Sequence, residues 1–286
     1  MANIRLIRRR IRGVQSTAKI TRAMEMIATS KMRRAQEAGI AGRPYDQKIR
    51  QVIADLAAIP HTGELHPLLQ RREVKKIAIV HISPDRGLCG GLNANLNRKT
   101  AGFILGEKIP VTVTVVGRKG IDFMRRYGRE VRAEFTQLGD RPSLLDTLAI
   151  SRIIIDDYTS GYVDEVYVVY TRFVSTMLQT PVMEKLLPIE PPVSTQTVSI
   201  DFDYEPASED VLGALLPRFV EMEIYHAILE SIASEQSARM VAMRSATDNA
   251  EELIQDLTLM YNKARQEAIT TELLDISGGA AALAKS

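Results

Sequence analysis

The chain has 286 residues, 45% of them hydrophobic and 25% charged, a balance that excludes disordered and collagen-like proteins. No run reaches the roughly 18 to 20 apolar residues that a membrane-spanning helix needs. The formal net charge is +2. However, residues 1–50 hold 13 Lys and Arg against 3 Asp and Glu, whereas residues 205–286 hold 6 against 14.

The first 59 residues are predicted to form one long helix. Small or apolar residues recur there at alternating spacings of three and four, which is typical of a helix that packs against another along its length. Pro44 is the expected position of a kink or break, and the glycine-rich segment 39–45 is expected to bend. The repeat consists of Ile4, Ile7, Ile11, Val14, Ala18, Thr21, Glu25, Ala28, Met32 and Ala35.

The middle of the chain changes to an alternation of strands and helices. Short β-branched runs predict strands at 76–83, 111–116 and 165–169, with a further edge strand near 197–202. Helical segments are expected near 93–105, 119–127 and 143–158. This alternation favours a mostly parallel sheet covered by helices, in a Rossmann-like α/β domain over 74–204.

Residues 209–286 are predicted to form a second long helix that ends near Gly278. Because the two terminal helices carry opposite net charge, an antiparallel coiled coil between them satisfies both their apolar seams and their charges. The fold class is therefore α/β with long terminal helices, in three parts at 1–59, 74–204 and 209–286. The expected seam consists of Ala246, Ala250, Leu253, Leu257, Met260, Ala264, Glu267, Thr271 and Leu274.

A glycine-rich turn, SPDRGLCGGLN at 83–93, follows a predicted strand and precedes a helix. That is where a phosphate or dinucleotide is bound in many α/β folds. The spacing matches neither standard nucleotide-binding pattern, so a tight structural turn is favoured. Cys89 is the single cysteine and the four histidines are scattered, and we predict no catalytic, cofactor-binding or metal site.

The basic N-terminus also fits a nucleic-acid-binding arm. Against that reading, Ile4, Ile7 and Ile11 continue the helical repeat, and the first 44 positions contain no aromatic residue that could stack on bases. The arginines are therefore expected to face the acidic C-terminal helix or another protein, not nucleic acid. Two alternatives stay open: an enzyme with a ligand in the glycine turn, and a coiled-coil scaffold or nucleic-acid-binding protein.

Four separated motifs resemble the gamma subunits of F-type ATP synthases: KITRAMEMIATSKMRRAQ at 19–36, DRGLCGGLN at 85–93, ESIASEQSARMVAMRSATDN at 230–249 and YNKARQEAITTELLDISGGAA at 261–281. The resemblance implies a non-catalytic rotor shaft, present in one copy inside a ring of three alpha and three beta subunits. It also implies an epsilon subunit alongside, a foot on the membrane c-subunit ring, and a peripheral location at the cytoplasmic face of a bacterial plasma membrane. The coupling ion, proton or sodium, is left open.

The resemblance also assigns partner contacts to individual residues. Arg9, Arg22 and Met24 would meet acidic loops of the beta subunits. Arg265 and Gln266 would hydrogen-bond with a beta-subunit loop, the alternative being an ordinary exposed helix face. Residues Tyr204 and Glu205 would contact the rotor ring. The lone Cys89 excludes an internal dithiol switch, and the absence of a transit sequence favours a bacterial source.

Overall fold

A computed structural model describes residues 4–58, 66–127, 130–190 and 208–283. The chain divides into two compact units. Unit 1 contains Met1–Ile27 and Met240–Ser286, and unit 2 contains Ala28–Arg239. None of the helices in the described part of the chain combines the length and apolarity that crossing a membrane requires.

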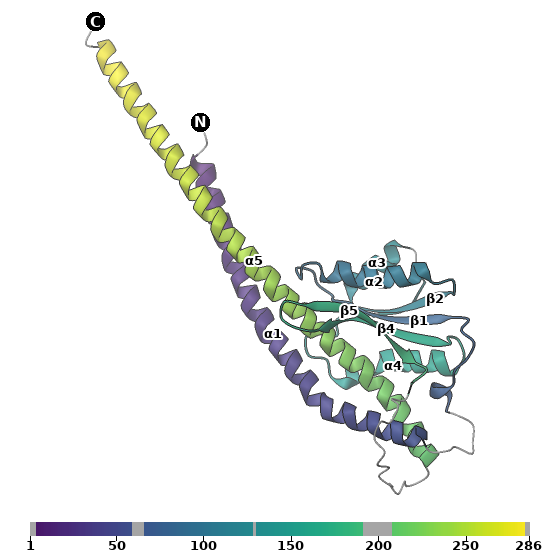
Figure 1. Cartoon of the computed structure of the whole chain (residues 1–286). Helices are drawn as coiled ribbons and strands as arrows, with labels where there is room; N and C mark the ends of the chain where they lie inside the picture. The colour runs from purple at the N-terminus through teal and green to yellow at the C-terminus, as the bar shows by residue number, and fades with distance from the viewer. Residues whose placement is uncertain (1–3, 59–65, 128–129, 191–207, 284–286) are drawn as a thin grey trace. The chain divides into compact units, whose positions relative to one another are not determined.

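Unit 2 is built on a five-stranded sheet in the order β3-β2-β1-β4-β5 (Figure 1). The first four strands run parallel and β5 runs antiparallel to β4, which confirms the predicted mostly parallel sheet. The strands are β1 Ile77–Ile82, β2 Val111–Val116, β3 Val131–Phe135, β4 Glu165–Phe173 and β5 Gln179–Leu187. Between them lie α2 Leu92–Gly106, α3 Arg118–Arg126 and α4 Leu144–Thr159, and the short 3-10 helix η1 Pro67–Leu69 precedes β1.

Both faces of the sheet are covered, so β1 is buried along its whole length. Ile79 packs into the core that contains α2 and α3. Its neighbours Ala78 and Val80 point to the other face and join the core formed with α1, α4 and α5. A strand buried on both faces reads as a continuous apolar run, and this is why β1 was predictable.

Two strands escaped the sequence prediction. β3, with the sequence VRAEF, has alternating half-buried and exposed residues and no β-branched run. β5 contains Pro181, which a strand accepts at the edge of a sheet because its missing N–H is not needed there. The edge strand predicted near 197–202 lies outside the described residues.

The two terminal helices are α1 Ile4–Ala58 and α5 Ser208–Leu283, so the helix end predicted near Gly278 is wrong. Pro44 lies inside α1 without interrupting it, so of the kink or break predicted there, a break is wrong. Figure 1 shows that the blue C-terminal part of α1 nevertheless bends. Within unit 1, Thr21 contacts Thr247 and Glu25 contacts Arg244, so the helices run antiparallel as predicted.

The expected seam of α1 is confirmed, because each of its ten residues is buried or half-buried. The expected seam of α5 is partly wrong. Ala250, Leu257 and Ala264 are buried, but Met260 is 60% exposed and Tyr261 takes its place. Met260 and Tyr261 are neighbours in the sequence, so a repeat of three and four residues accepts either one as a seam residue. The actual period of the helix decides which of the two is buried. The predicted seam residues Glu267, Thr271 and Leu274 are exposed as well, and Ile254 replaces Leu253. The three-part division of the chain stays a prediction.

Candidate functional site

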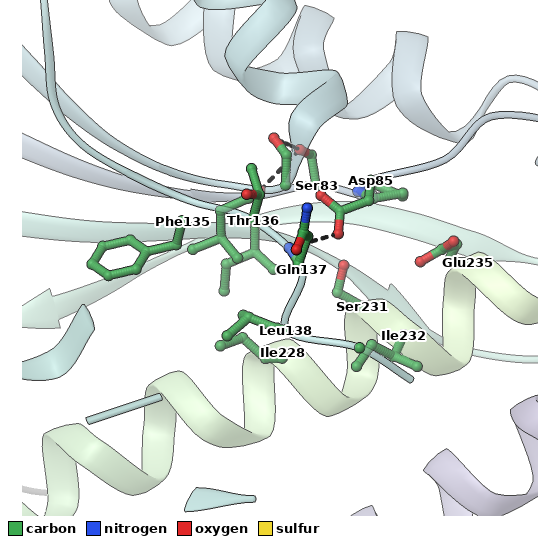
Figure 2. Close-up of a pocket in the computed structure, with 15 residues that line it drawn as sticks. Ser83, Asp85, Phe135, Thr136, Gln137, Leu138, Ile228, Ser231, Ile232 and Glu235 are labelled. Atoms are coloured by element: carbon green, nitrogen blue, oxygen red, sulfur yellow. Dashed lines mark hydrogen bonds between the residues drawn. The ribbon is translucent and has the colours of Figure 1, made fainter. Parts of the chain in front are cut away.

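The glycine-rich turn between β1 and α2 uses its polar groups to hold neighbouring loops. The carboxylate of Asp85 accepts hydrogen bonds from the backbone N–H groups of Arg118 and Gln137, each at 2.9 Å. The second of these bonds is drawn in Figure 2. Leu88 and Gly90 adopt positive φ angles of 63° and 59°. The turn therefore joins the loops that follow β1, β2 and β3.

Ser83 and Gly117 form the tightest contact of this region. Gly117 has a φ of +94°, and a Cβ there would lie 1.8 Å from the Ser83 carbonyl oxygen. The Ser83 hydroxyl donates to the Val116 carbonyl at 2.9 Å and accepts from the Gly120 N–H at 2.8 Å. The Ser83 backbone fills the space beside Gly117, and the side chains of His81 and Ser83 fill the space beside Gly120, so these two glycines allow the loops after β1 and β2 to pack closely.

Helix α5 lies against this edge of the sheet through a polar face that we call the α5 socket. Ser234 donates to the Thr171 carbonyl and Ser237 to the Thr176 carbonyl, both at 2.9 Å. Arg239 donates to the Gly87 carbonyl at 3.1 Å. Both serine side chains are fully buried. These bonds attach one helix to strand β4, to the loop that follows β4 and to the loop that follows β1. The α5 socket comprises Ser231, Ser234, Glu235, Ser237 and Arg239.

Glu235 and Arg239 are the charged members of the α5 socket. Their side chains form an ion pair at 2.6 Å and are 13% and 10% exposed. Burial raises the pKa of the Glu235 carboxyl, whereas the Arg239 guanidinium lowers it. An ion pair this deeply buried depends on both partners, because removing one leaves the other charged and unsolvated.

A cavity of about 50 Å³ remains between the α5 socket and the turn. Figure 2 shows Ser231 and Glu235 of α5 facing Asp85 and Gln137 across it. Ligand sites in proteins occupy about 300 to 1,000 Å³, so this space is too small for a nucleotide. The position at which α/β folds bind dinucleotides is filled here by the chain's own helix.

Cys89 does not offer a reactive thiolate. Its side chain is 1% exposed, and burial raises the pKa of the thiol, an effect that the nearby Arg239 guanidinium partly opposes. The Asn93 amide donates to its sulfur at 3.3 Å. In the described part of the chain, no group of His, Cys, Asp and Glu is arranged to hold a metal ion.

Unit 1 contains a polar cluster between its two helices, which we call the helix clasp. The hydroxyls of Thr21 and Thr247 lie 2.7 Å apart. Arg22 pairs with Glu251 at 2.9 Å, and Arg244 pairs with Glu25 at 2.8 Å. Both helices carry a positive and then a negative residue in chain order, and because they run antiparallel each charge meets its opposite. The helix clasp comprises Thr21, Arg22, Glu25, Arg244, Thr247 and Glu251.

The residues predicted to contact partners have different surroundings. Arg9, Arg265 and Gln266 are exposed, and Met24 is half-buried. Arg22 is exposed too, but it already belongs to the helix clasp. All five lie in unit 1, whereas Tyr204 and Glu205 lie outside the described residues.

Sequence reasoning missed both the α5 socket and most of the helix clasp. One available signal was Glu25, a charged residue inside an otherwise small or apolar repeat. Another was the abundance of Ser, Gln and Arg residues in 231–239, because a solvent-exposed helix face alone does not account for so many of them. Neither signal names the partner residue, because the partners are far away in the sequence.

Comparison with known proteins assigns the family. The family model described as ATP synthase matches residues 3–283. The ATP synthase gamma chain of Dehalococcoides mccartyi strain CBDB1 is 67% identical over 285 residues, covering 99% of this chain and all of the relative. The chain belongs to the ATP synthase gamma chain family. The gamma chain of Roseiflexus castenholzii is 51% identical over the full length of both.

Solved structures share the fold of this gamma chain family member. The rotor of the Euglena gracilis mitochondrial ATP synthase aligns over 93% of this chain with a TM-score of 0.63 and 21% identity, covering 98% of that chain. The central stalk and c-ring structure of the Tetrahymena thermophila mitochondrial ATP synthase aligns over 79% with a TM-score of 0.61 and 22% identity, covering 99% of that chain. This chain therefore shares its fold with both mitochondrial structures.

Proposed function

We propose that the chain is the central-stalk rotor of an F-type ATP synthase. It would couple ion flow through a membrane c-subunit ring to ATP synthesis or hydrolysis in a ring of three alpha and three beta subunits. The observation that carries the proposal is the full-length relation to gamma chains in a chain whose longest element, α5, is one helix of 76 residues. Such a helix is about 110 Å long.

The continuity of α5 supports a mechanical role. A continuous helix backbone transmits rotation along its length, and the α5 socket attaches residues 231–239 of this helix to the sheet and loops of unit 2 through buried hydrogen bonds. An asymmetric shaft presses differently on each of three equivalent subunits and so biases each toward a different conformation. In this proposal the chain is non-catalytic, and ATP chemistry belongs to the neighbouring subunits.

The remaining partners follow from the same proposal. An epsilon subunit would bind alongside the chain, and the assembled complex would be a proton-transporting ATP synthase at the cytoplasmic face of the bacterial membrane. Arg9, Arg22, Met24, Arg265 and Gln266 are proposed to contact beta subunits. Tyr204 and Glu205 are proposed to contact the rotor ring. The exposed side chains of Arg9, Arg265 and Gln266 are available for such contacts.

Assembly with partner subunits tests the rotor role. The chain is co-expressed with alpha and beta subunits from one of its close bacterial relatives, and the purified complex is assayed for ATP hydrolysis. We expect one copy of the chain per three-plus-three ring, hydrolysis that depends on the chain, and none from the chain alone. Nucleotide hydrolysis by the isolated chain, or failure to join the ring, contradicts the proposal.

Substitutions then test the beta-subunit contacts. Arg265→Ala with Gln266→Ala is expected to lower the ATPase rate of the complex at least about threefold, since a hydrogen bond contributes a net of about 0.5–1.5 kcal/mol. Lys263→Ala is the matched control, because Lys263 is exposed on the same helix. Equal rates for both variants would assign Arg265 and Gln266 to an ordinary solvent-exposed surface.

A further inference from the structure

A second cavity lies within unit 2, between the second half of α1, the middle of α5, and strands β4 and β5. Its volume is about 660 Å³, within the range of about 300 to 1,000 Å³ that small-molecule sites occupy. Apolar side chains form part of its wall, among them Ile40, Val168 and Phe173. None of its lining residues also lines the small cavity at the glycine turn.

The wall of this cavity is held in place by a close helix crossing. A Cβ on Gly42 of α1 would lie 2.5 Å from the His226 ring of α5. Beyond this point Arg50 forms an ion pair with Glu223, and its guanidinium also lies 5.0 Å from the centre of the Phe219 ring. The space is thus bounded by packed helices and a sheet, which is how preformed ligand sites are built.

Six charged side chains line the cavity, and four of them neutralise one another. Glu223 is paired with Arg50. Glu184 is paired with Arg172 and also accepts a hydrogen bond from the Tyr170 hydroxyl at 2.8 Å. The charges that decide the chemistry of the site are therefore the remaining two, Arg43 and Glu230.

Glu230 and Arg43 differ in their surroundings. One carboxyl oxygen of Glu230 is buried without a hydrogen-bond partner. Burial raises the pKa of this carboxyl. The Arg172 and Arg43 guanidiniums lower this pKa, whereas the Glu184 carboxylate raises it further. Arg43 is exposed and forms no hydrogen bond or ion pair with any residue that the structure describes. The three arginines and three glutamates that line the cavity balance in formal charge. Arg43 is the arginine among them that forms no ion pair with a described residue, and a guanidinium stays charged at every physiological pH.

We propose that this cavity binds an amphipathic monoanion, an organic acid whose carboxylate or sulfonate pairs with Arg43 and whose apolar body packs against Ile40, Val168 and Phe173. A guanidinium offers two parallel N–H donors that match a carboxylate. The apolar body of such a ligand buries its surface against this wall, a contribution to binding that a simple inorganic anion cannot make. The site goes beyond the rotor function and does not depend on it.

The test uses the full chain and 8-anilinonaphthalene-1-sulfonate, a fluorescent sulfonate with an apolar body. We expect saturable binding at one site per chain and displacement by decanoate. Arg43→Gln should weaken this binding at least tenfold. Arg34→Gln is the matched control, since Arg34 is exposed on the same helix and does not line the cavity. Circular dichroism of each variant verifies that its helices are intact.

Two further variants separate the cavity from other apolar surfaces and fix the sign of the ligand's charge. Gly39→Leu should also weaken binding at least tenfold, because a Cβ on Gly39 meets no atom within 4 Å and the new side chain would occupy the cavity. Glu230→Gln should leave binding equal or tighter. Absence of saturable binding, no displacement by decanoate, no effect of Arg43→Gln, or a loss of binding in Glu230→Gln would each overturn the proposal.

Discussion

At the scale of single residues, His81 shows how the sheet accommodates a buried polar group. The ring is fully buried, and Nδ1 lies 2.9 Å from the Thr100 hydroxyl. Thr100 itself donates to the Leu96 carbonyl at 3.3 Å, so the His81 Nδ1–H is the donor in their bond. Nε2 has no hydrogen-bond partner in the described part of the chain. Burial lowers the pKa of His81 to about 4.

Acid should therefore destabilise unit 2 through His81. The ordinary pKa is 6.5 and the folded value is about 4, so between these values the unfolded chain binds more protons. The stabilisation is complete above about pH 6.5 and disappears as pH falls toward 4, a loss of about 3 kcal/mol. Urea unfolding at pH 7 and pH 4.5 measures it. His81→Asn, which can still donate to Thr100, should lose about 2 kcal/mol less over this interval. Parallel losses in both proteins would exclude His81 as the cause.

Arg239 is the residue on which the α5 socket most depends. Arg239→Ala should lower the free energy of unfolding by about 3 to 5 kcal/mol, because the Glu235 carboxylate would stay buried without its counter-ion. Denaturant titration at pH 7 measures this cost. Adding Glu235→Gln should recover a large part of it, since the amide carries no charge. If the single variant costs less than about 1 kcal/mol, the pair behaves as a surface ion pair and the socket has no energetic role.

At the scale of elements, the contact between α1 and α5 contains the polar residues of the helix clasp in addition to small apolar side chains such as alanine. The Thr247 hydroxyl lies 2.9 Å from the Met243 carbonyl and the Thr21 hydroxyl 3.1 Å from the Ala18 carbonyl. The two hydroxyls lie 2.7 Å apart, and each has one proton, so one of them donates to the other and the other donates to its own helix. The side chains of Arg22 and Glu251 are 62% and 50% exposed. An ion pair so exposed contributes little to stability, and the buried threonines are the energetically important part of the clasp.

Single and double substitutions of these threonines should therefore differ. Thr247→Val removes the bond between the two hydroxyls but leaves Thr21 its bond to the Ala18 carbonyl, so it should cost about 0.5 to 1.5 kcal/mol. Thr21→Val combined with Thr247→Val should cost less than the sum of the two single changes, since both remove the same bond. Thermal unfolding followed by circular dichroism compares the unchanged protein, the two single variants and the double variant. Additive losses would show that the hydroxyls do not interact in solution.

At the scale of the whole molecule, the two units differ in how they are stabilised. Unit 2 contains two buried hydrophobic clusters on the two faces of its sheet. In the described part of unit 1, burial is restricted to a narrow seam of residues such as Met243, Ala250, Leu257 and Ala264. Large side chains near the C-terminal end of α5, including Ile269 and Leu274, are exposed.

Hydrogen exchange of the isolated chain should report this difference. Amides of residues 250–280 in α5 are expected to exchange at least about ten times faster than those of β1 and β4, because segments with few buried contacts open locally at low free energy. Mass spectrometry of proteolytic fragments measures the rates. Assembly with alpha and beta subunits should slow exchange in this segment while leaving β1 unchanged. Equal protection of both segments in the free chain would contradict the expected difference.

The sequence alone determined the features that rest on local periodicity and apolar content. The seam of α1 follows from spacings of three and four residues, and its ten members are buried or half-buried in the structure. Strand β1 and helices α2, α3 and α4 lie within one or two residues of their predicted bounds. The motifs at both ends of the chain indicated the gamma chain family, to which the comparisons assign it.

The tertiary structure decided what depends on residues distant in the chain. Thr21 meets Thr247, which is 226 positions away, and Arg239 reaches Gly87, which is 152 positions away. Periodicity predicts that a side chain is buried, but not which atom forms a hydrogen bond with it. Strand β5 is tolerated with its proline because it lies at the sheet edge. The glycine turn has a nucleotide site's location but not its space, because α5 folds back to fill it.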